Sequence, residues 1–158
     1  LGFIGRFVPQ KNIYFFIEIL KGLSDDYKLL MIGEGPQKEE FIKKCDAECV
    51  LDRIIFISET NEVYKYYSAM DIFCLPSLFE GLPVVGVEAQ VNGLQCIFSD
   101  NITGECMILP KTKFCNLNSK IWIDTISQLD NNHDSAKLGN QYDINVQSKI
   151  FENILMGL

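Results

Sequence analysis

Histidine, the commonest metal ligand among side chains, is scarce in this chain. Among the 158 residues the only histidine is His133. A zinc site needs about four ligands at a defined spacing. Cys45 and Cys49 are four positions apart on an expected helix, but the histidine is remote from them in sequence. We therefore expect no metal site and no other bound cofactor.

Long apolar runs are also missing. No run approaches the roughly 20 residues that a membrane-spanning helix requires. The chain begins directly in a strand-like segment, without a charged leader followed by an apolar signal region. These features predict a cytoplasmic protein.

Positive charge is in short supply. Lysine and arginine total 14 residues against 21 aspartates and glutamates, which gives a net charge of -7. Proteins that bind nucleic acids generally do so through clustered cations. We therefore expect no nucleic-acid partner, and any phosphate site must be local.

Six cysteines are spread thinly over the chain, so their density is low for a secreted disulfide scaffold. Cys74 and Cys96 lie inside apolar, strand-like runs. Buried free thiols are the better interpretation, because unpaired cysteine is among the most buried residue types.

The length and a hydrophobic content of 47% suit one domain with a sizeable core. Apolar, strand-like runs alternate with helical patterns along it. The expected strands are 1–5, 27–33, 53–58, 72–75, 95–99 and 106–109. The expected helices are 11–23, 36–45, 60–69, 83–92 and 119–129, with a last helical stretch over 135–155.

This alternation is typical of βαβ units. The sequence therefore predicts an α/β fold with a Rossmann-like, doubly wound parallel sheet and helices on both faces. In the strand order 3-2-1-4-5-6, the first and fourth strands are neighbours, and ligands bind beyond their carboxyl ends. Gly5 and Arg6 after the first strand would then share a crevice with Ser77 and Glu80 after the fourth.

Two carboxylates mark the segment after the fourth expected strand. Glu80 lies in a loop, and Glu88 follows eight positions later within the first turns of a helix that Pro83 opens. The free N–H groups of a helix start, here around Leu82 and Val85, form an anion site. The alternative is that both glutamates are ordinary exposed carboxylates.

Arg6 and Lys11 are five positions apart after the first expected strand. A guanidinium and an ammonium can together hold a diphosphate, although both could equally be solvated surface charges. A dinucleotide fingerprint, G-x-G-x-x-G, fails at Gly33, because Lys38 occupies the position of its third glycine.

The string PSLFEGLPVVGVEA, from Pro76 to Ala89, resembles the E-x7-E signature of the retaining, two-domain glycosyltransferases that use nucleotide sugars. The resemblance is to the large family 4, also called group 1, and covers nearly the whole chain. It matches the C-terminal, donor-binding domain, which is one half of a GT-B fold. Residues 1–158 would be this domain, and the N-terminal acceptor domain is absent from the chain.

The resemblance also implies roles for single residues. Arg6 and Lys11 would stabilise the departing nucleoside diphosphate. Glu80 would lie close to the donor sugar and the departing phosphate, and Glu88 would accept hydrogen bonds from the ribose hydroxyls. The further expected contacts of the nucleotide sugar are Gly5, Gly33, Ser58, Ser77, Gly81, Leu82, Pro83 and Val84.

For three of these residues, the role in nucleotide binding has an alternative or departs from the family pattern. Gly33 could instead be a structural turn glycine, and so could Gly81. Ser58 stands where the family commonly has a glycine whose backbone contacts the base, so the choice between uridine and guanosine stays open.

The run 99–105 resembles the corresponding segment of bacterial capsule and exopolysaccharide enzymes, and indicates polysaccharide assembly.

By the same resemblance, the full enzyme would use a UDP- or GDP-sugar donor and a saccharide or lipid-linked saccharide acceptor. It would need no obligatory metal and would be cytoplasmic, associating peripherally with the inner face of the cell membrane. Two alternatives remain open: another GT-B enzyme of sugar nucleotides, such as an epimerase, and a non-catalytic nucleotide-binding module.

Overall fold

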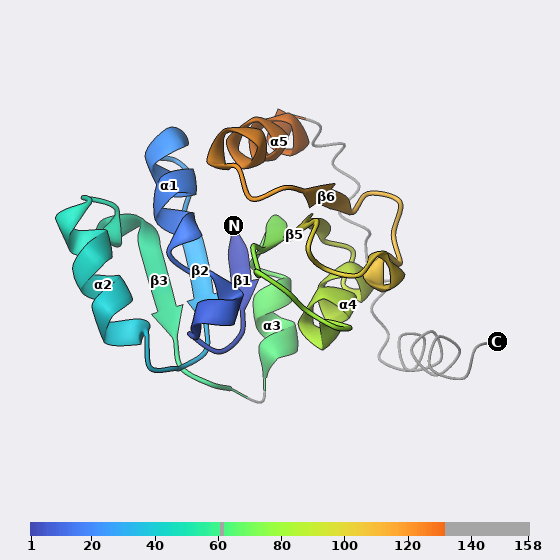
Figure 1. Cartoon of the computed structure of the whole chain (residues 1–158), viewed down its shortest axis with the longest axis horizontal. Coiled ribbons are helices and arrows are strands. Elements are labelled where there is room, and N and C mark those ends of the chain that lie inside the picture. The colour runs from blue at the N-terminus through green and yellow to red at the C-terminus, as the bar shows by residue number, and fades with distance from the viewer. Residues whose placement is uncertain (61, 132–158) are drawn as a thin grey trace.

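A parallel sheet of six strands organises the residues that the computed structural model describes, 1–60 and 62–131 (Figure 1). The strands are β1 (Gly2–Ile4), β2 (Leu29–Ile32), β3 (Ile54–Ile57), β4 (Ile72–Leu75), β5 (Gln95–Ser99) and β6 (Lys113–Cys115). Their order is β3-β2-β1-β4-β5-β6, with every neighbouring pair parallel. This confirms the predicted doubly wound order.

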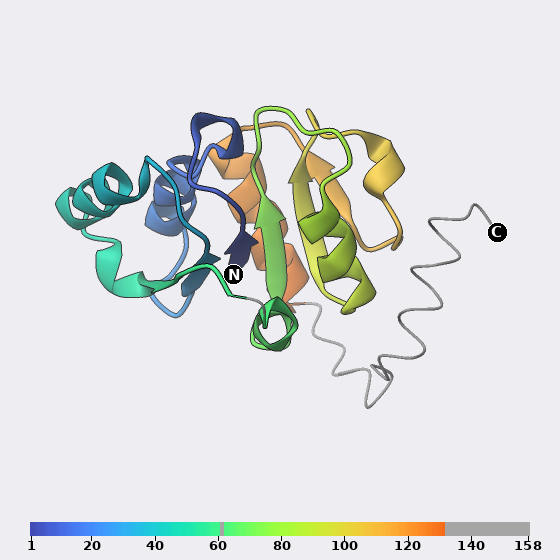
Figure 2. The ribbon, with the colours of Figure 1, turned by 90° about the horizontal axis from the view of Figure 1, so that it is seen from below.

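Helices cover both faces of the sheet. They are α1 (Phe15–Gly22), α2 (Lys38–Ala47), α3 (Val63–Tyr67), α4 (Val84–Val91) and α5 (Ser119–Asn131). Helices α1 and α5 lie against each other on one face, and Figure 2 shows α3 and α4 on the opposite face. The helix predicted over 135–155 lies outside the described residues.

The core follows from the apolar strands. All residues of β1 and β4 are buried, as expected of parallel strands that are covered on both faces. Trp122 of α5 is fully buried and meets Phe15 of α1 edge to face, with ring centroids 5.4 Å apart. All six cysteines are free thiols, and five of them are buried, whereas Cys49 is exposed.

The sixth strand was predicted in the wrong place. The apolar run 106–109 is not a strand, and β6 comes four residues later, paired with β5 from Ile97↔Lys113 to Ser99↔Cys115. The cause is Gln90 on α4, whose buried amide oxygen accepts hydrogen bonds from the Ile108 and Leu109 N–H groups at 2.8 and 3.1 Å. A side chain therefore takes the donors that a strand would have used.

Helix starts also differ from the prediction. The first helix begins at Phe15 rather than at residue 11, because Pro9–Lys11 forms a 3-10 turn that ends at Asn12 in the left-handed region, with φ 52°. The third begins at Val63 rather than at residue 60. The fourth begins at Val84, so Pro83 is its N-cap residue.

Candidate functional site

The carboxyl ends of β1 and β4 bring together three of the expected site residues. Lys11 forms a short ion pair with Glu80, and their side chains are only 16% and 10% exposed. Ser77, which is fully buried, donates a hydrogen bond from its hydroxyl to Glu80 Oε1 at 2.8 Å. The loops after β1 and β4 therefore lie side by side, as the strand order predicts, with a cation and a carboxylate paired between them.

Gln10 links the loop after β1 to the loop after β4 through hydrogen bonds. Its backbone oxygen accepts from the Leu78 N–H at 2.8 Å, and its side-chain amide donates to the Phe79 oxygen at 3.0 Å. Glu80 also forms a backbone bridge with Ile102 in the loop after β5. No local pattern marks Gln10 as a site residue, since its partners lie about 70 residues away along the chain.

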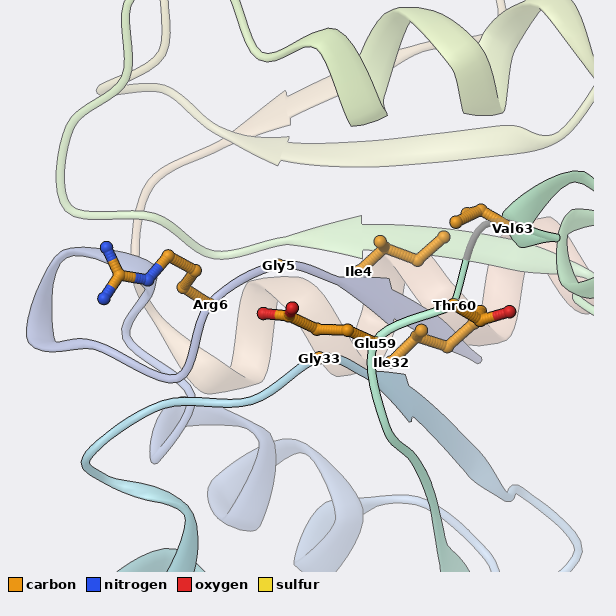
Figure 3. Close-up of a pocket in the computed structure, with 8 residues that line it drawn as sticks. All are labelled: Ile4, Gly5, Arg6, Ile32, Gly33, Glu59, Thr60 and Val63. Carbon is orange, nitrogen blue, oxygen red and sulfur yellow. The ribbon is translucent and has the colours of Figure 1, made fainter.

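A cavity of about 560 Å³ opens beyond the carboxyl ends of β1 and β2 (Figure 3). Its volume is in the usual range for small-molecule sites, about 300–1,000 Å³. The residues that line it are Ile4, Gly5, Arg6, Ile32, Gly33, Glu59, Thr60 and Val63. Gly5, Arg6 and Gly33 were expected from the sequence, whereas Glu59 and Thr60 were not.

Lys11 connects the cavity to the Glu80 cluster. A methyl group placed on Gly5 would lie 3.5 Å from Lys11 Cε, so the lysine stem packs beside Gly5, which lines the cavity. The Arg6 side chain, which also lines the cavity, is exposed. Both cations therefore flank Gly5, Arg6 as the next residue of the chain and Lys11 through its side-chain stem.

Gly33 is required by the fold as well as lining the cavity. Its φ is +141°, and a methyl group on it would lie 2.1 Å from the Gly5 oxygen. No other residue fits there without moving the backbone, because a side chain needs more than 3 Å and rarely adopts that φ. The structural alternative considered for Gly33 therefore holds.

Ser58, an expected nucleotide contact, lies beside the cavity residue Glu59 in the chain. It does not line the cavity, and its hydroxyl hydrogen-bonds Glu34 in the loop after β2. Lys38 donates to the same carboxylate at 2.6 Å. The Lys38 hydrogen bond, followed by that of Ser58, lowers the pKa of Glu34.

Glu88 lies on α4 and is held by Tyr67. The Tyr67 hydroxyl donates to Glu88 Oε2 at 2.8 Å and approaches the Val85 oxygen at 3.1 Å. Burial of the ring, with the Glu88 carboxylate adding to it, raises the pKa of Tyr67 above its ordinary value. Val63 and Tyr67 are one helical turn apart on α3, so Glu88 adjoins the helix that lines the cavity.

The start of α4 is open to solvent. The N–H groups of Gly86 and Val87 donate to the Pro83 oxygen, so the amides of Val84 and Val85 precede the helical ladder. Leu82 and Val84 are more than half exposed. A methyl group on Gly81 would meet no atom within 4 Å, and Gly81 has no positive φ, so neither packing nor conformation requires this glycine.

Metal ligands and membrane-spanning helices can be assessed for residues 1–60 and 62–131. Within these ranges, no group of three or more His, Cys, Asp or Glu side chains is arranged to hold a metal ion. In the same part of the chain, no helix combines the length and apolar character needed to cross a membrane.

The chain is similar to known proteins along most of its length. A family profile described as "Glycosyl transferases group 1" matches residues 1–136. UDP-Gal:alpha-D-GlcNAc-diphosphoundecaprenol alpha-1,3-galactosyltransferase of Escherichia coli is 32% identical over 111 residues, which is 66% of this chain and 29% of that protein. Amylovoran biosynthesis glycosyltransferase AmsD of Erwinia amylovora is 30% identical over 107 residues, 67% of this chain and 30% of that protein.

Among solved structures, a mutant of TarM from S. aureus in complex with fondaparinux, alpha-GlcNAc-glycerol and UDP has the same fold, with a TM-score of 0.78 at 23% identity. The superposition covers 98% of this chain and 31% of TarM. The chain thus spans less than a third of each of these proteins.

Proposed function

The chain belongs to the group 1 glycosyl transferases, and from this premise we propose that it binds the nucleotide-sugar donor of a retaining glycosyltransferase. The observation that carries the proposal is the meeting of Lys11, Ser77 and Glu80, with the Lys11 stem packed beside Gly5 of the cavity. Loops that are far apart in sequence converge there on one charged crevice, at the topological switch point of the sheet.

In this proposal the parts of the donor occupy successive parts of the crevice. The base enters the cavity beyond β1 and β2, and Glu88 accepts hydrogen bonds from the ribose. The diphosphate lies against Arg6, Lys11 and the amino end of α4, whose free amides favour an anion. Gly81 leaves room for the sugar beside Glu80, since nothing occupies the space in front of it.

Arg6 and Lys11 would act on the leaving group. Negative charge grows on the diphosphate as the bond from the sugar to the phosphate breaks, and fixed cations stabilise that charge. Lys11 is held in place by Glu80, which is itself fixed by Ser77 and Gln10. The transferred sugar then goes to an acceptor hydroxyl with retention at its anomeric carbon.

The complete protein would take its acceptor from a second domain. We propose a saccharide or lipid-linked saccharide acceptor, in capsule, exopolysaccharide or O-antigen synthesis at the inner face of the cell membrane. The names of the two relatives support this, since one refers to a diphosphoundecaprenol-linked sugar and the other to amylovoran biosynthesis. This chain alone would bind the donor and transfer little or nothing.

Calorimetry of UDP, GDP and ADP with the wild-type chain and with Arg6→Ala tests the proposal. The substitution should weaken the best-bound diphosphate about ten- to a hundredfold and its nucleoside far less, because a hydrogen bond to a charged group contributes about 1.5–3 kcal/mol. The loss should shrink at high salt. Lys43→Ala, which removes an exposed cation on α2, is the matched control. Equal weakening of nucleoside and diphosphate would contradict the proposed role of Arg6.

A further inference from the structure

The cavity wall offers few groups that could pair with the edge of a base. The Gly5 N–H donates to the Ile32 oxygen and the Gly33 N–H to the Ile57 oxygen, each at 3.0 Å. Both N–H groups are therefore already used in backbone hydrogen bonds and cannot donate to a base. Ile4, Ile32 and Val63 present apolar side chains. With Arg6 engaged by the diphosphate, the polar side chains left among the described lining residues are those of Glu59 and Thr60.

Among the described residues that line the cavity, Glu59 is the only carboxylate. Figure 3 shows it between the backbone at Gly5 and at Gly33, on the Arg6 side of the cavity. Within residues 1–60 and 62–131, no cation lies within ion-pair distance of it. A carboxylate of this kind can only accept hydrogen bonds.

The Thr60 hydroxyl already makes one hydrogen bond within its own loop. Its Oγ1 accepts a hydrogen bond from the Glu62 N–H at 3.1 Å, which leaves the hydroxyl proton to donate. The wall therefore offers two acceptor oxygens from Glu59 on the Arg6 side of the cavity, whereas the Thr60 hydroxyl points to the opposite side (Figure 3). A base that presents two neighbouring donors on one edge would complement the Glu59 carboxylate.

On these grounds we propose that Glu59 selects guanine, so that the donor is a GDP-sugar; this inference rests on the proposed function. Guanine carries two adjacent donors, N1–H and the N2 amino group, which can pair with both oxygens of a carboxylate. Charge-assisted, two-point hydrogen bonds of this type are among the strongest in proteins.

The other common bases fit the carboxylate poorly. Uracil has a single donor, N3–H, between two carbonyl oxygens, so the second carboxylate oxygen would face a lone pair. Adenine places the bare N1 beside its amino group, with the same result. Repulsion of the wrong partner is an established route to selectivity. The cavity of about 560 Å³ admits any of these bases, so size does not decide between them.

A guanine preference would separate this chain from the E. coli relative, whose name specifies UDP-Gal. The test is calorimetric titration of the wild-type chain with GDP, UDP and IDP, which lacks the N2 amino group. GDP should bind about ten- to a hundredfold more tightly than UDP, as expected for hydrogen bonds to a charged group. IDP should fall between them, because it keeps only one of the two donors.

Glu59→Gln provides the second arm of the experiment. A glutamine amide presents one donor and one acceptor, which complements N3–H and O4 of uracil. The ratio of GDP to UDP affinity should therefore fall at least about tenfold in this variant. The matched control is Glu62→Gln, which removes an exposed carboxylate that pairs with Lys65 and does not line the cavity. It should leave the ratio unchanged.

The outcomes separate this inference from the proposed function. Tighter binding of UDP than of GDP, or a ratio that Glu59→Gln does not change, overturns guanine selection and leaves the nucleotide site in place. Failure of every nucleoside diphosphate to bind the wild-type chain overturns both. Because IDP is compared on the wild-type chain, the inference is tested even if the variant folds poorly.

Discussion

Gly81 and Gly104 form a natural pair for separating binding from folding. A methyl group on either would meet no atom within 4 Å, and neither has a positive φ. Of the two, only Gly81 adjoins Glu80 in the chain, where Glu80 contacts Lys11 and Ser77. Gly81→Ala should therefore keep or slightly raise the free energy of unfolding, by up to about 1 kcal/mol. It should also weaken binding of the nucleotide sugar about fivefold to a hundredfold, because the methyl enters space that the ligand needs.

Gly104→Ala should match that stability change without weakening binding. Urea unfolding and calorimetry of both variants make the comparison. If both variants bind the donor as well as the wild-type chain does, the sugar does not approach Gly81.

Glu88 provides a second prediction at this scale. Tyr67 donates to one of its carboxylate oxygens, which orients the group for the ribose. Glu88→Gln should weaken the preferred ribonucleoside diphosphate about ten- to a hundredfold and spare its 2′,3′-dideoxy analogue. Calorimetry measures both affinities, and the dideoxy analogue, which lacks the ribose hydroxyls, serves as the control. An equal loss for both would make Glu88 a structural carboxylate of α4.

The sequence allowed the main site residues to be predicted, but not their supports. Lys11, Ser77 and Glu80 meet because strand order alone places their loops together, and strand order follows from the alternation of strands and helices. Gln10 and Glu59 depend on loop conformations that no spacing encodes. Gln10 reaches across two loops, and Glu59 rather than its neighbour Ser58 lines the cavity.

Among the elements, the end of α1 depends on one buried side chain. Arg53, just before β3, is 5% exposed and donates to the oxygens of Leu20 and Ser24, both at 2.7 Å. It also reaches the Tyr27 oxygen at 3.1 Å. One guanidinium therefore satisfies the carbonyls at the end of the helix and in the loop that leads to β2.

Arg53→Ala should lower the free energy of unfolding by about 3–5 kcal/mol, because several buried carbonyls lose their donor. Arg53→Lys should recover only part of this, since an ammonium cannot span the same acceptors. Urea unfolding measures both. Arg6→Ala, which removes an exposed arginine, is the control and should stay within about 0.5 kcal/mol of the wild-type chain. A loss below about 1 kcal/mol for Arg53→Ala would contradict this role.

Element boundaries were the least predictable part of the fold. Apolar content identified the first five strands, but it could not distinguish a strand over 106–109 from a loop held by a buried amide. The amide nitrogen of Gln90 donates to the Cys106 oxygen at 2.8 Å, and its oxygen accepts from the Thr112 hydroxyl at 2.7 Å. These tertiary hydrogen bonds decide the path of the chain, and the local sequence carries no sign of them.

The whole molecule should lose stability in alkaline solution because of its buried thiols. Burial raises the pKa of Cys74 to about 12, whereas an unfolded thiol titrates near pH 8.5. Between these values the unfolded chain releases the proton and the folded chain keeps it. The contribution of Cys74 is therefore full below about pH 8.5 and declines as the pH rises toward 12.

From pH 8 to pH 10, Cys74 alone should cost about 2 kcal/mol of unfolding free energy. Cys74→Ala should remove that part of the pH dependence, and Cys49→Ala, at the exposed thiol, should leave it unchanged. Urea unfolding under reducing conditions at the two pH values gives the comparison. Identical slopes for the wild-type chain and Cys74→Ala would show that Cys74 is accessible to solvent.

The position of the nucleotide on the molecule is the central claim. A second cavity, of about 470 Å³, lies at the opposite end of the sheet and is lined by Lys28 and Asp71 among others. The two cavities are far enough apart for backbone amide NMR to distinguish them. Titration of the chain with GDP or UDP, whichever binds more tightly, should shift the amides of Gly5, Gly33 and Val85. Shifts confined to the region of Lys28 and Asp71, or no shifts at saturating nucleotide, would contradict the account.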